Sequence, residues 1–320
     1  MFQLRRFTLA LAALSVCATT VQAQGLIRPI RVVVGVPPGG PSDTAIRLIA
    51  PKMSEALGQP LVVDNRPGSN GVMGTEIASK AAPDGLTFNV GNSGTHAINA
   101  SLYRKLPYDP VSDFAPVTQM VTSGMVLAAN AKLPARSLDE FLALAKKQPG
   151  RTNIGIAGAT GQLAGDALWS LTQVKMSNVH YKGSAPAEIA LLGGEIDLVL
   201  LTPLATMQHI KAGRLKAFGI TSAQRSPLLP NVATVSEQGV KGYSYEIWHG
   251  IFAPARTPDA IVRKVNKAAV AALNGPEIKE RFNALGFTVI GNTPEEFAAV
   301  VKREVEKYRK VIAESGIPLL

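Results

Sequence analysis

The sequence is nearly free of cysteine: its 320 residues include one, Cys17. A disulfide needs two cysteines, so the chain cannot form one internally. Charged residues (18%) and aromatic residues (6%) are also scarce, whereas hydrophobic residues make up 46%. This composition does not indicate disorder, and the length is sufficient for two domains with sizeable cores.

The N-terminal segment lacks an apolar run long enough to span a membrane, and it has the layout of a secretory signal peptide. Two arginines precede an apolar run over residues 7–16, and a small-residue site ends at Ala23. The bulky Val16 before Cys17 disfavours a lipoprotein. We expect residues 1–23 to be cleaved off after Ala23. The mature chain then lies in the periplasm, without a thiol nucleophile or a cysteine-ligated metal.

The positive charge of the chain favours no single class of partner. Loss of the two N-terminal arginines lowers the formal net charge from +10 to +8. Such an excess serves either solubility or the attraction of anionic ligands, and the sequence leaves both open. Runs of Lys and Arg with interleaved aromatic residues are absent, so nucleic acid is not an expected partner.

Strand-like and helix-like segments alternate along the rest of the chain. Apolar, often β-branched runs predict strands at residues 30–36, 60–65, 86–92, 124–130, 152–157, 178–181, 195–201 and 215–221. Their alternation with helical patterns implies α/β domains with mostly parallel sheets. Since no linker rich in Ser and Gly divides the chain, we expect it to cross between two lobes within residues 117–130 and 243–254. The C-terminal helices then return to the first lobe.

Capping residues mark several predicted helix starts. Ser137 and Glu140 have the spacing of a capping box. Thr257 and Thr293 each precede a proline, which suits an N-cap followed by the first helical position. Pro51 conflicts with the helical spacing around it, because an interior proline costs a helix about 3 kcal/mol. We expect a kink or a break there.

A glycine-rich loop follows the first predicted strand. In open parallel sheets, ligands bind beyond the carboxyl ends of strands, near backbone amides and helix N-termini. Gly39 and Gly40 permit close approach of the backbone to a ligand carboxylate or phosphate, and Ser42 or Asp43 can cap the next helix. An ionised Asp43 would repel an anion, so it suits a cap or a contact to a ligand hydroxyl or amine.

Two further loops occupy equivalent positions after strands. Ser93, Thr95 and His96 offer hydroxyls and a ring nitrogen in the second loop. Thr160 and Gly161 start a helix in the third. For each of these loops, a plain connecting turn is the alternative.

Motifs of the common enzyme classes are absent. The chain has no Gly-Lys-Ser/Thr phosphate loop, no Gly-x-Gly-x-x-Gly after a strand and no Gly-x-Ser-x-Gly elbow. Its four histidines form no His-x-x-x-His pair, so no metal site is expected. A serine–histidine arrangement built from distant segments, with His96 or His249, stays open as a minor alternative. We expect neither catalysis nor a cofactor.

Several blocks in a fixed order resemble the solute-binding receptors of tripartite tricarboxylate transporters, the Bug family. They cover residues 32–88, 106–120, 179–200, 215–239 and 248–258. The resemblance implies a type II periplasmic binding protein fold, in which two α/β lobes close on a small organic carboxylate. It implies delivery of that ligand to membrane transporter subunits. We expect a monomer.

The same resemblance implies lobe boundaries and ligand contacts. Lobe 1 takes residues 24–121 and 247–320, and lobe 2 takes residues 122–246. The implied ligand contacts are Pro38, Gly39, Gly40, Ser42, Asp43, Ser93, Thr95, His96, Ala159, Thr160, Gly161, Gln162, Tyr181 and Lys182. Ala159 stands where the family commonly has a hydroxyl, and Gln162 stands where a histidine is common. These departures make the second-lobe loop the expected source of specificity.

Other functions share this predicted architecture. A ligand sensor would use the same lobes and pass its closed form to a membrane kinase. A periplasmic hydrolase would use the histidines. An exported structural protein fits poorly with three glycine-containing loops at strand ends.

The first prediction concerns export. When the full chain is produced with a secretion system, the mature protein should begin at Gln24, because the small-residue site ends at Ala23. N-terminal sequencing and intact mass measure this. A chain that still begins at Met1, or a lipid on Cys17, would contradict it.

Overall fold

The computed structural model describes residues 28–157, 159–181, 183–315, 319 and 320. The predictions on the signal peptide and on Lys182 lie outside these residues, as does the side chain of Ala159. Within the described part, no helix is long and apolar enough to cross a membrane.

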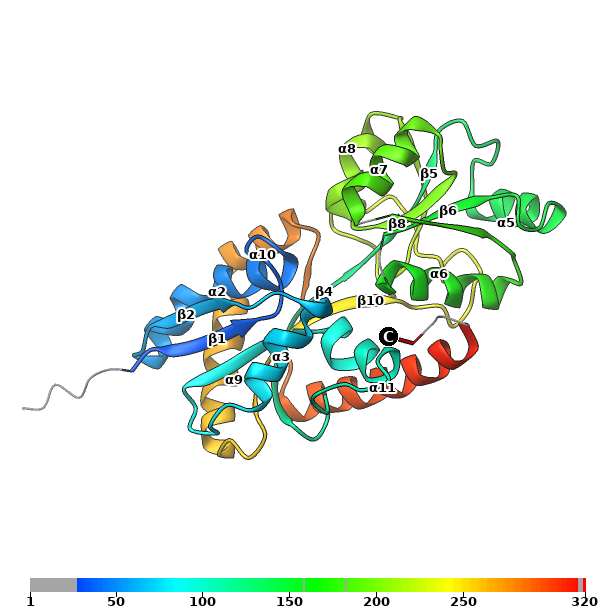
Figure 1. Cartoon of the computed structure of the whole chain (residues 1–320). Helices are drawn as coiled ribbons and strands as arrows, with labels where there is room; N and C mark the ends of the chain where they lie inside the picture. Colours follow the sequence, from blue (N-terminus) through cyan, green and yellow to red (C-terminus); the bar gives the residue numbers. More distant parts are fainter. Residues whose placement is uncertain (1–27, 158, 182, 316–318) are drawn as a thin grey trace, which may run out of the picture.

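Two mixed sheets, each flanked by helices, form two lobes (Figure 1). The first sheet has the order β11-β4-β10-β3-β1-β2. Its strands are β1 (Ile30–Val34), β2 (Leu61–Asn65), β3 (Thr87–Asn92), β4 (Phe114–Gly124), β10 (Glu246–Pro254) and β11 (Thr288–Val289). The second sheet has the order β7-β6-β8-β5-β9. Its strands are β5 (Val126–Asn130), β6 (Asn153–Ile156), β7 (Ser177–His180), β8 (Leu198–Leu201) and β9 (Leu215–Ile220).

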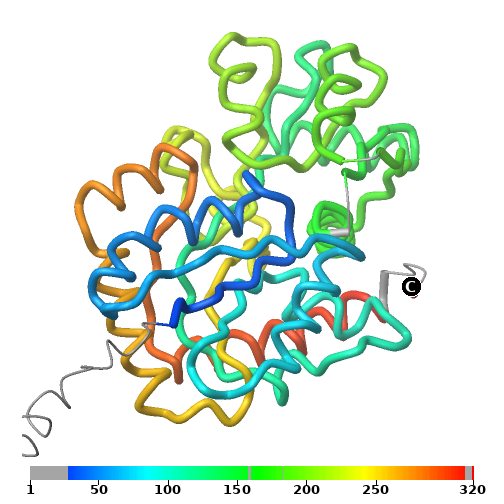
Figure 2. The backbone as a smooth tube through the Cα atoms, turned by 60° about the vertical axis from the view of Figure 1, so that its left-hand side comes forward, coloured from blue at the N-terminus to red at the C-terminus, as the bar shows by residue number. Residues whose placement is uncertain are grey.

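The chain passes between the sheets twice, from β4 to β5 and from β9 to β10 (Figure 2). Strands β1, β2 and β3 are parallel, as are β6, β7 and β8. By contrast, β10 is antiparallel to β3 and β4, and β5 is antiparallel to β8 and β9. A strand that enters a sheet from the other lobe must run away from that lobe. This is why each sheet is mixed rather than mostly parallel as predicted.

Helices cover both sheets. They are α2 (Pro41–Leu57), α3 (Val72–Ser79), α4 (Asn99–Leu102), α5 (Leu138–Lys147), α6 (Ala159–Thr172), α7 (Ser184–Gly193), α8 (Pro203–Lys211), α9 (Asp259–Leu273), α10 (Pro276–Ala284) and α11 (Pro294–Ser315). A 3-10 turn, η1 (Ser69–Gly71), precedes α3, and a π-helical turn, η2 (Gly94–Ile98), precedes α4. The C-terminal helices return to the first sheet as predicted: α9 packs on α2 and β4, and α11 packs on η2 and β4.

The valines of β1 explain its hydrophobic run. Val32 and Val34 pack into one core with α2 and α9, and Val33 packs into the core on the opposite face of the sheet. A parallel strand that is buried on both faces needs apolar residues at successive positions rather than at alternate ones.

The predicted break at Pro51 is wrong, because α2 is one helix from Pro41 to Leu57, whereas a kink within this helix stays a prediction. Pro51 removes the hydrogen bond to the carbonyl of Arg47, four residues earlier. Both residues are exposed, so water can satisfy that carbonyl. The opposite face, with Ile49 and Met53, is buried and stabilises the helix.

The structure confirms two of the predicted helix caps and corrects the third. The Ser137 side chain accepts from the Glu140 amide, as the capping box requires. Thr293 Oγ1 accepts from the Glu296 amide, and the Glu296 carboxylate accepts from the Thr293 amide. Thr257 is not an N-cap, because α9 begins one residue later and the Thr257 hydroxyl donates to the carbonyl of Pro254.

The second prediction tests the cap of α11. Thr293→Ala should lower the free energy of unfolding by about 1 kcal/mol, because the amide of Glu296 loses its acceptor. Thr293→Ser keeps an oxygen at this place and should stay within a few tenths of a kcal/mol of the parent. Urea unfolding followed by circular dichroism measures both variants. Equal stability of the Ala and Ser variants would contradict the cap.

Candidate functional site

The carboxyl ends of the parallel strands in both sheets face the space between the lobes. In the second sheet, Leu201 at the end of β8 pairs with Val126, the residue with which the chain enters that sheet. In the first sheet, Asn92 at the end of β3 pairs with His249 of the entering strand β10. The loops after β1, β3, β6 and β8 therefore lie at the sheet edges that face the interlobe cleft, where ligands of open α/β sheets bind.

The glycine loop after β1 already uses two of its own amides. The amide of Gly39 donates to Asp43 Oδ2 (2.9 Å), and the amide of Gly40 donates to the carbonyl of Pro37 (3.1 Å). Gly39 has φ +82°, a conformation that favours glycine. The helix α2 has Gly40 as its N-cap, so the predicted cap by Ser42 or Asp43 is wrong. A ligand carboxylate cannot accept from the two glycine amides unless it displaces these bonds.

The Asp43 side chain fixes the conformation of the glycine loop. Its buried carboxylate accepts from Arg47 Nε (2.8 Å) and Asn65 Nδ2 (2.8 Å) as well as from Gly39. The same Asn65 amide also donates to the carbonyl of Val36. Burial alone would raise the pKa of Asp43, but the bonds from Arg47, Gly39 and Asn65 outweigh it and hold the pKa below its ordinary value. Asp43 therefore positions the loop, and its charge is already compensated.

The backbone amides that remain available to a ligand lie in the first turn of α2. Thr44 is the first donor to an intrahelical carbonyl, that of Gly40. The amides of Ser42 and Asp43 precede it, and such first-turn amides have no partner within the helix. They lie where the helix dipole favours an anion.

The hydroxyl of Ser42 connects α2 with β10 and β3. Ser42 Oγ lies 2.9 Å from Nδ1 of His249 on β10. The side chain of Asn92, at the end of β3, donates to the same oxygen (3.3 Å). All three side chains are buried or half-buried, and burial lowers the pKa of His249 to about 4. His249 is thus neutral at pH 7.

The loop after β3 divides its predicted residues between core and cleft. His96 is fully buried, stacks on Phe252 with ring centroids 3.9 Å apart and accepts or donates at Thr95 Oγ1 (2.9 Å). Burial lowers its pKa to about 3. Thr95 closes a turn with Asn92 through both its amide and its hydroxyl. Both residues therefore serve the local structure, and we leave them out of the site proposed below.

The Ser93 hydroxyl is buried and has no hydrogen-bond partner within the described residues, and the same holds for Nε2 of His96. A buried polar group without a partner costs about 1–3 kcal/mol. A water or a ligand oxygen at the end of β3 would remove that cost.

The second lobe presents the first turn of α6 at the same cleft. Thr160, Gly161 and Gln162 are half-buried there, directly after β6. Gln162 hydrogen-bonds Asp166 one turn later, although burial still raises the pKa of Asp166. The ring of Tyr181 packs with the apolar core of the second lobe, close to Gly155.

A cavity of about 130 Å³ lies between the lobes beside the first loop. It is lined from the first lobe by Gly39, Pro41 and His249, and from the second lobe by Thr202 and Pro203. Sequence reasoning did not place His249 or Thr202 in a binding site. The signals were present, since Thr202 follows a predicted strand and His249 stands in a family block. The strand order that brings them to Gly39 was not visible.

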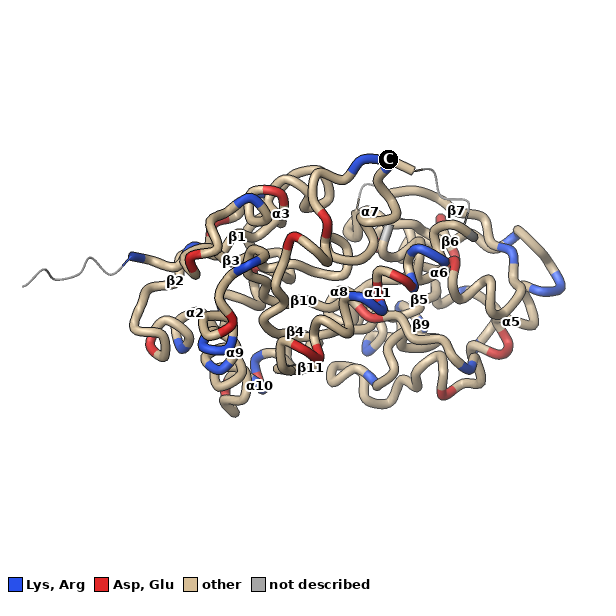
Figure 3. Tube along the Cα trace, turned by 90° about the horizontal axis from the view of Figure 1, so that it is seen from below, with Lys and Arg blue, Asp and Glu red and all other residues tan. Residues whose placement is uncertain are grey.

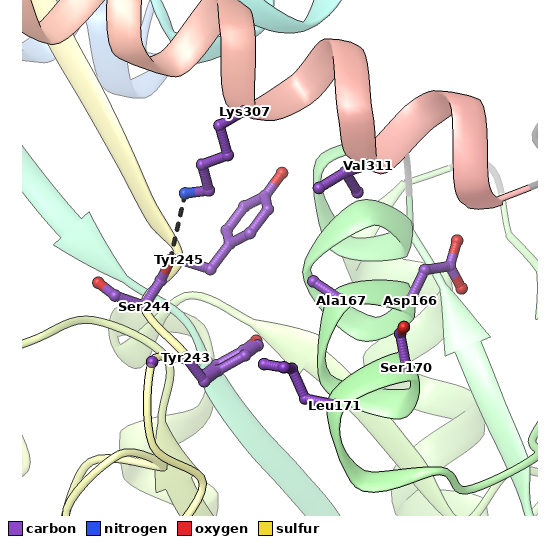
Figure 4. A pocket seen from close by; sticks show the side chains of 10 residues that line it. Asp166, Ala167, Ser170, Leu171, Tyr243, Ser244, Tyr245, Lys307 and Val311 are labelled. Carbon is purple, nitrogen blue, oxygen red and sulfur yellow. Dashed lines mark hydrogen bonds between the residues drawn. The ribbon is translucent and has the colours of Figure 1, made fainter.

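A larger cavity, of about 290 Å³, lies between α6 and α11 (Figure 4). Lys307 points into it, but its ammonium group donates to the carbonyl of Ser244 (3.2 Å) and lies 5.2 Å from the ring centre of Tyr245. Asp166 contributes a carboxylate to the lining. This cavity contains none of the strand-end loops, and its one cation is already engaged, so it does not suit a carboxylate ligand.

Charges on the rest of the surface show no concentration toward one kind of partner. In Figure 3, Lys and Arg are interspersed with Asp and Glu over both lobes. Among the described residues, no three His, Cys, Asp or Glu side chains gather in a way that could hold a metal ion.

Comparison with known proteins gives matches along almost the whole chain. The family described as "Tripartite tricarboxylate transporter family receptor" (TctC) matches residues 45–317. Protein BugT of Bordetella pertussis is 33% identical over 295 residues, which cover 91% of this chain and 90% of the relative.

Solved structures agree with the sequence matches. Rpa4515 of R. palustris with adipate has a TM-score of 0.79 and 32% identity, and the match covers 93% of this chain and 100% of that one. MatC of Rhodopseudomonas palustris with bound malate has a TM-score of 0.74 and 32% identity, and the match covers 90% and 99% of the two chains.

The third prediction tests the role of Asp43. Asp43→Asn should lower the free energy of unfolding at pH 7 by about 1–3 kcal/mol, because the bonds to Arg47 and Gly39 lose their charge assistance. A lowered pKa stabilises the fold above the ordinary value of 3.8, and this contribution disappears as the pH falls through the folded-state pKa. The difference between the two proteins should therefore shrink from pH 7 to pH 3.

Urea unfolding at several pH values measures this difference. Glu306→Gln, at an exposed position of α11, serves as the control and should show little difference at any pH. A difference for Asp43→Asn that stays constant down to pH 3 would contradict the assignment.

Proposed function

Because the chain belongs to the tripartite tricarboxylate transporter receptor family, we propose that it captures a small organic carboxylate between its lobes and delivers it to transporter subunits in the membrane. The family consists of periplasmic solute-binding receptors, and this chain is a receptor of that kind rather than an enzyme. The carboxylate and the transporter partner are the proposed parts.

One arrangement carries the proposal: two helix starts converge on one cleft from opposite lobes. The first turns of α2 and α6 both follow strands whose carboxyl ends face the cleft. First-turn amides and the positive end of the helix dipole bind anions. The carboxylates named with two related structures, adipate and malate, support the same ligand class.

We propose a ligand site that keeps six of the fourteen residues expected from the sequence. From lobe 1 it takes Pro38, the first turn of α2 with Ser42, and the unpartnered hydroxyl of Ser93. From lobe 2 it takes Thr160, Gly161 and Gln162. Ala159, Tyr181 and Lys182 stay predictions, while Asp43 acts through the position of the loop.

The hydrogen bond between Ser42 and His249 is not a hydrolase dyad in this setting. A nucleophilic serine needs a histidine that a third group orients and that can accept a proton. Among the described residues no carboxylate contacts His249, and burial disfavours its protonated form.

We propose that closure is a hinge motion between two rigid lobes, residues 24–121 with 247–320 and residues 122–246. The two crossings, between β4 and β5 and between β9 and β10, are the only connections of the two sheets within the described residues. We further propose that the mature protein acts as a monomer after cleavage behind Ala23. The closed form would then present one joint surface of both lobes to the transporter.

The fourth prediction tests the carboxylate site. Titration calorimetry of the mature protein against a panel of mono- and dicarboxylates should give saturable binding for at least one member. Gly161→Glu should weaken that binding by tenfold or more, about 1.4 kcal/mol, because it adds a negative charge at the start of α6. The variant should fold, since the nearest atom to a Cβ at this position is the Leu200 carbonyl oxygen, 3.6 Å away.

Ser170→Glu is the matched control. It adds the same charge to the same helix, at an exposed position more than two turns farther along, and should leave the affinity within about twofold. Equal loss in both variants would move the ligand away from the helix start. No binding of any carboxylate by the parent protein would overturn the proposed function.

A further inference from the structure

The cavity beside His249 contains no charged residue. None of the residues that line it is Lys, Arg, Asp or Glu. Its apolar surface comes from Pro41, Pro203, Leu204, Ile247, Leu285 and Phe287. Because it also includes Gly39 and borders Ser42 through His249, it lies next to the proposed carboxylate site.

We propose that the ligand is a monocarboxylate with an apolar body, and that this body occupies the cavity while the carboxylate lies at the helix starts. This inference rests on the proposed function and specifies the ligand class. Burying a second carboxylate among uncharged side chains would weaken binding, because no cation compensates its charge there.

The size of the cavity fits such a body. Its volume is about 130 Å³. An apolar cavity of about 150 Å³ is large enough to hold a benzene ring. A six-carbon ring or a short alkyl chain therefore fits, and a bulky bicyclic body does not.

Leu204 is an apolar lining residue of the cavity that remains partly exposed to solvent. This side chain at the start of α8 is 47% exposed although it lines the cavity. An apolar body in the cavity would cover it, and burial of apolar surface favours binding. Leu204 belongs to lobe 2, so the same contact would favour approach of the lobes.

His249 adds one polar group to the cavity. The Thr95 amide donates to Asn92 Oδ1 (3.1 Å), which turns the NH₂ group of Asn92 toward Ser42 Oγ. Ser42 accepts that bond and keeps its own hydroxyl hydrogen for a second partner, Nδ1 of His249. In the tautomer in which Nδ1 accepts from Ser42, the neutral ring carries its hydrogen on Nε2.

The ring of His249 is further held edge-on against Phe287, with ring centroids 5.7 Å apart. His249 therefore offers the cavity a ring in a fixed orientation, and in that tautomer its Nε2 is a neutral N–H donor. Such a donor suits a single hydroxyl, ether or carbonyl oxygen on the ligand body. Together with the hydroxyls of Thr44, Ser123 and Thr202, it is the polar part of the lining.

The fifth prediction compares monocarboxylates with dicarboxylates, and hexanoate and adipate form a pair of equal length. Calorimetry at pH 7 should show that hexanoate or benzoate binds the parent protein at least tenfold more tightly than adipate or malate, because only the dicarboxylates bring a second charge into the cavity. Equal or tighter binding of adipate or malate would overturn this inference and leave the proposed function intact. Failure of all four ligands and of the wider panel would count against the proposed function itself.

A variant pair locates the effect. Leu204→Lys places a cation at the cavity wall and should shift the preference toward adipate by tenfold or more. Ile189→Lys makes the same change at an exposed apolar position on α7 (69% exposed) outside the cavity, and should leave the preference unchanged. Thermal unfolding confirms that both variants fold. An unchanged preference in Leu204→Lys, or an equal shift in both variants, would overturn the placement of the ligand body.

Discussion

The candidate site depends on one constraint: the chain crosses between the two sheets twice, and each strand that enters a sheet must run away from the other lobe. Strands β5 and β10 therefore run against their neighbours, while the parallel strands β1, β3, β6 and β8 end at the cleft. Helix starts follow two of these ends from opposite lobes. The convergence of dipoles and free amides on one space is a consequence of connectivity rather than of any single residue.

Most polar groups near the cleft are already used by the protein. Asp43 takes the amide of Gly39 and the side chain of Asn65, and Thr95 closes a turn with Asn92. These bonds fix the loops before a ligand arrives, which lowers the ordering cost of binding. Within the described part of the chain, the groups left over include first-turn amides, the Ser93 hydroxyl and a ring nitrogen of His249. Selectivity between ligands then depends on the other side chains that line the site. In the cavity beside His249, none of these side chains is Lys, Arg, Asp or Glu.

Much of the fold was predictable because it depends on local spacing. The runs around Val33, Val90 and Val199 became strands, and the box at Thr293 became a helix start. Predictions that depended on distant surroundings failed. Pro51 is tolerated because its side of α2 faces water, and each sheet is mixed because of the crossings. The site was predictable as a set of loops after strands, but not as a set of free groups, since His96 turned into the core and the glycine amides bonded within their own loop.

The sequence by itself determined the order of strands and helices, the absence of cysteine after residue 17, the glycine loop and the blocks that the receptor family shares. These properties depend on residue type and on short spacings, and both can be read directly from the sequence. Only the tertiary structure decided which polar atoms stay available and what surrounds them. Ser42 and His249 are 207 positions apart, and they meet because β10 returns from the second lobe to lie beside β3. A hydrogen bond of that kind depends on the path of the whole chain, so no local pattern can specify it.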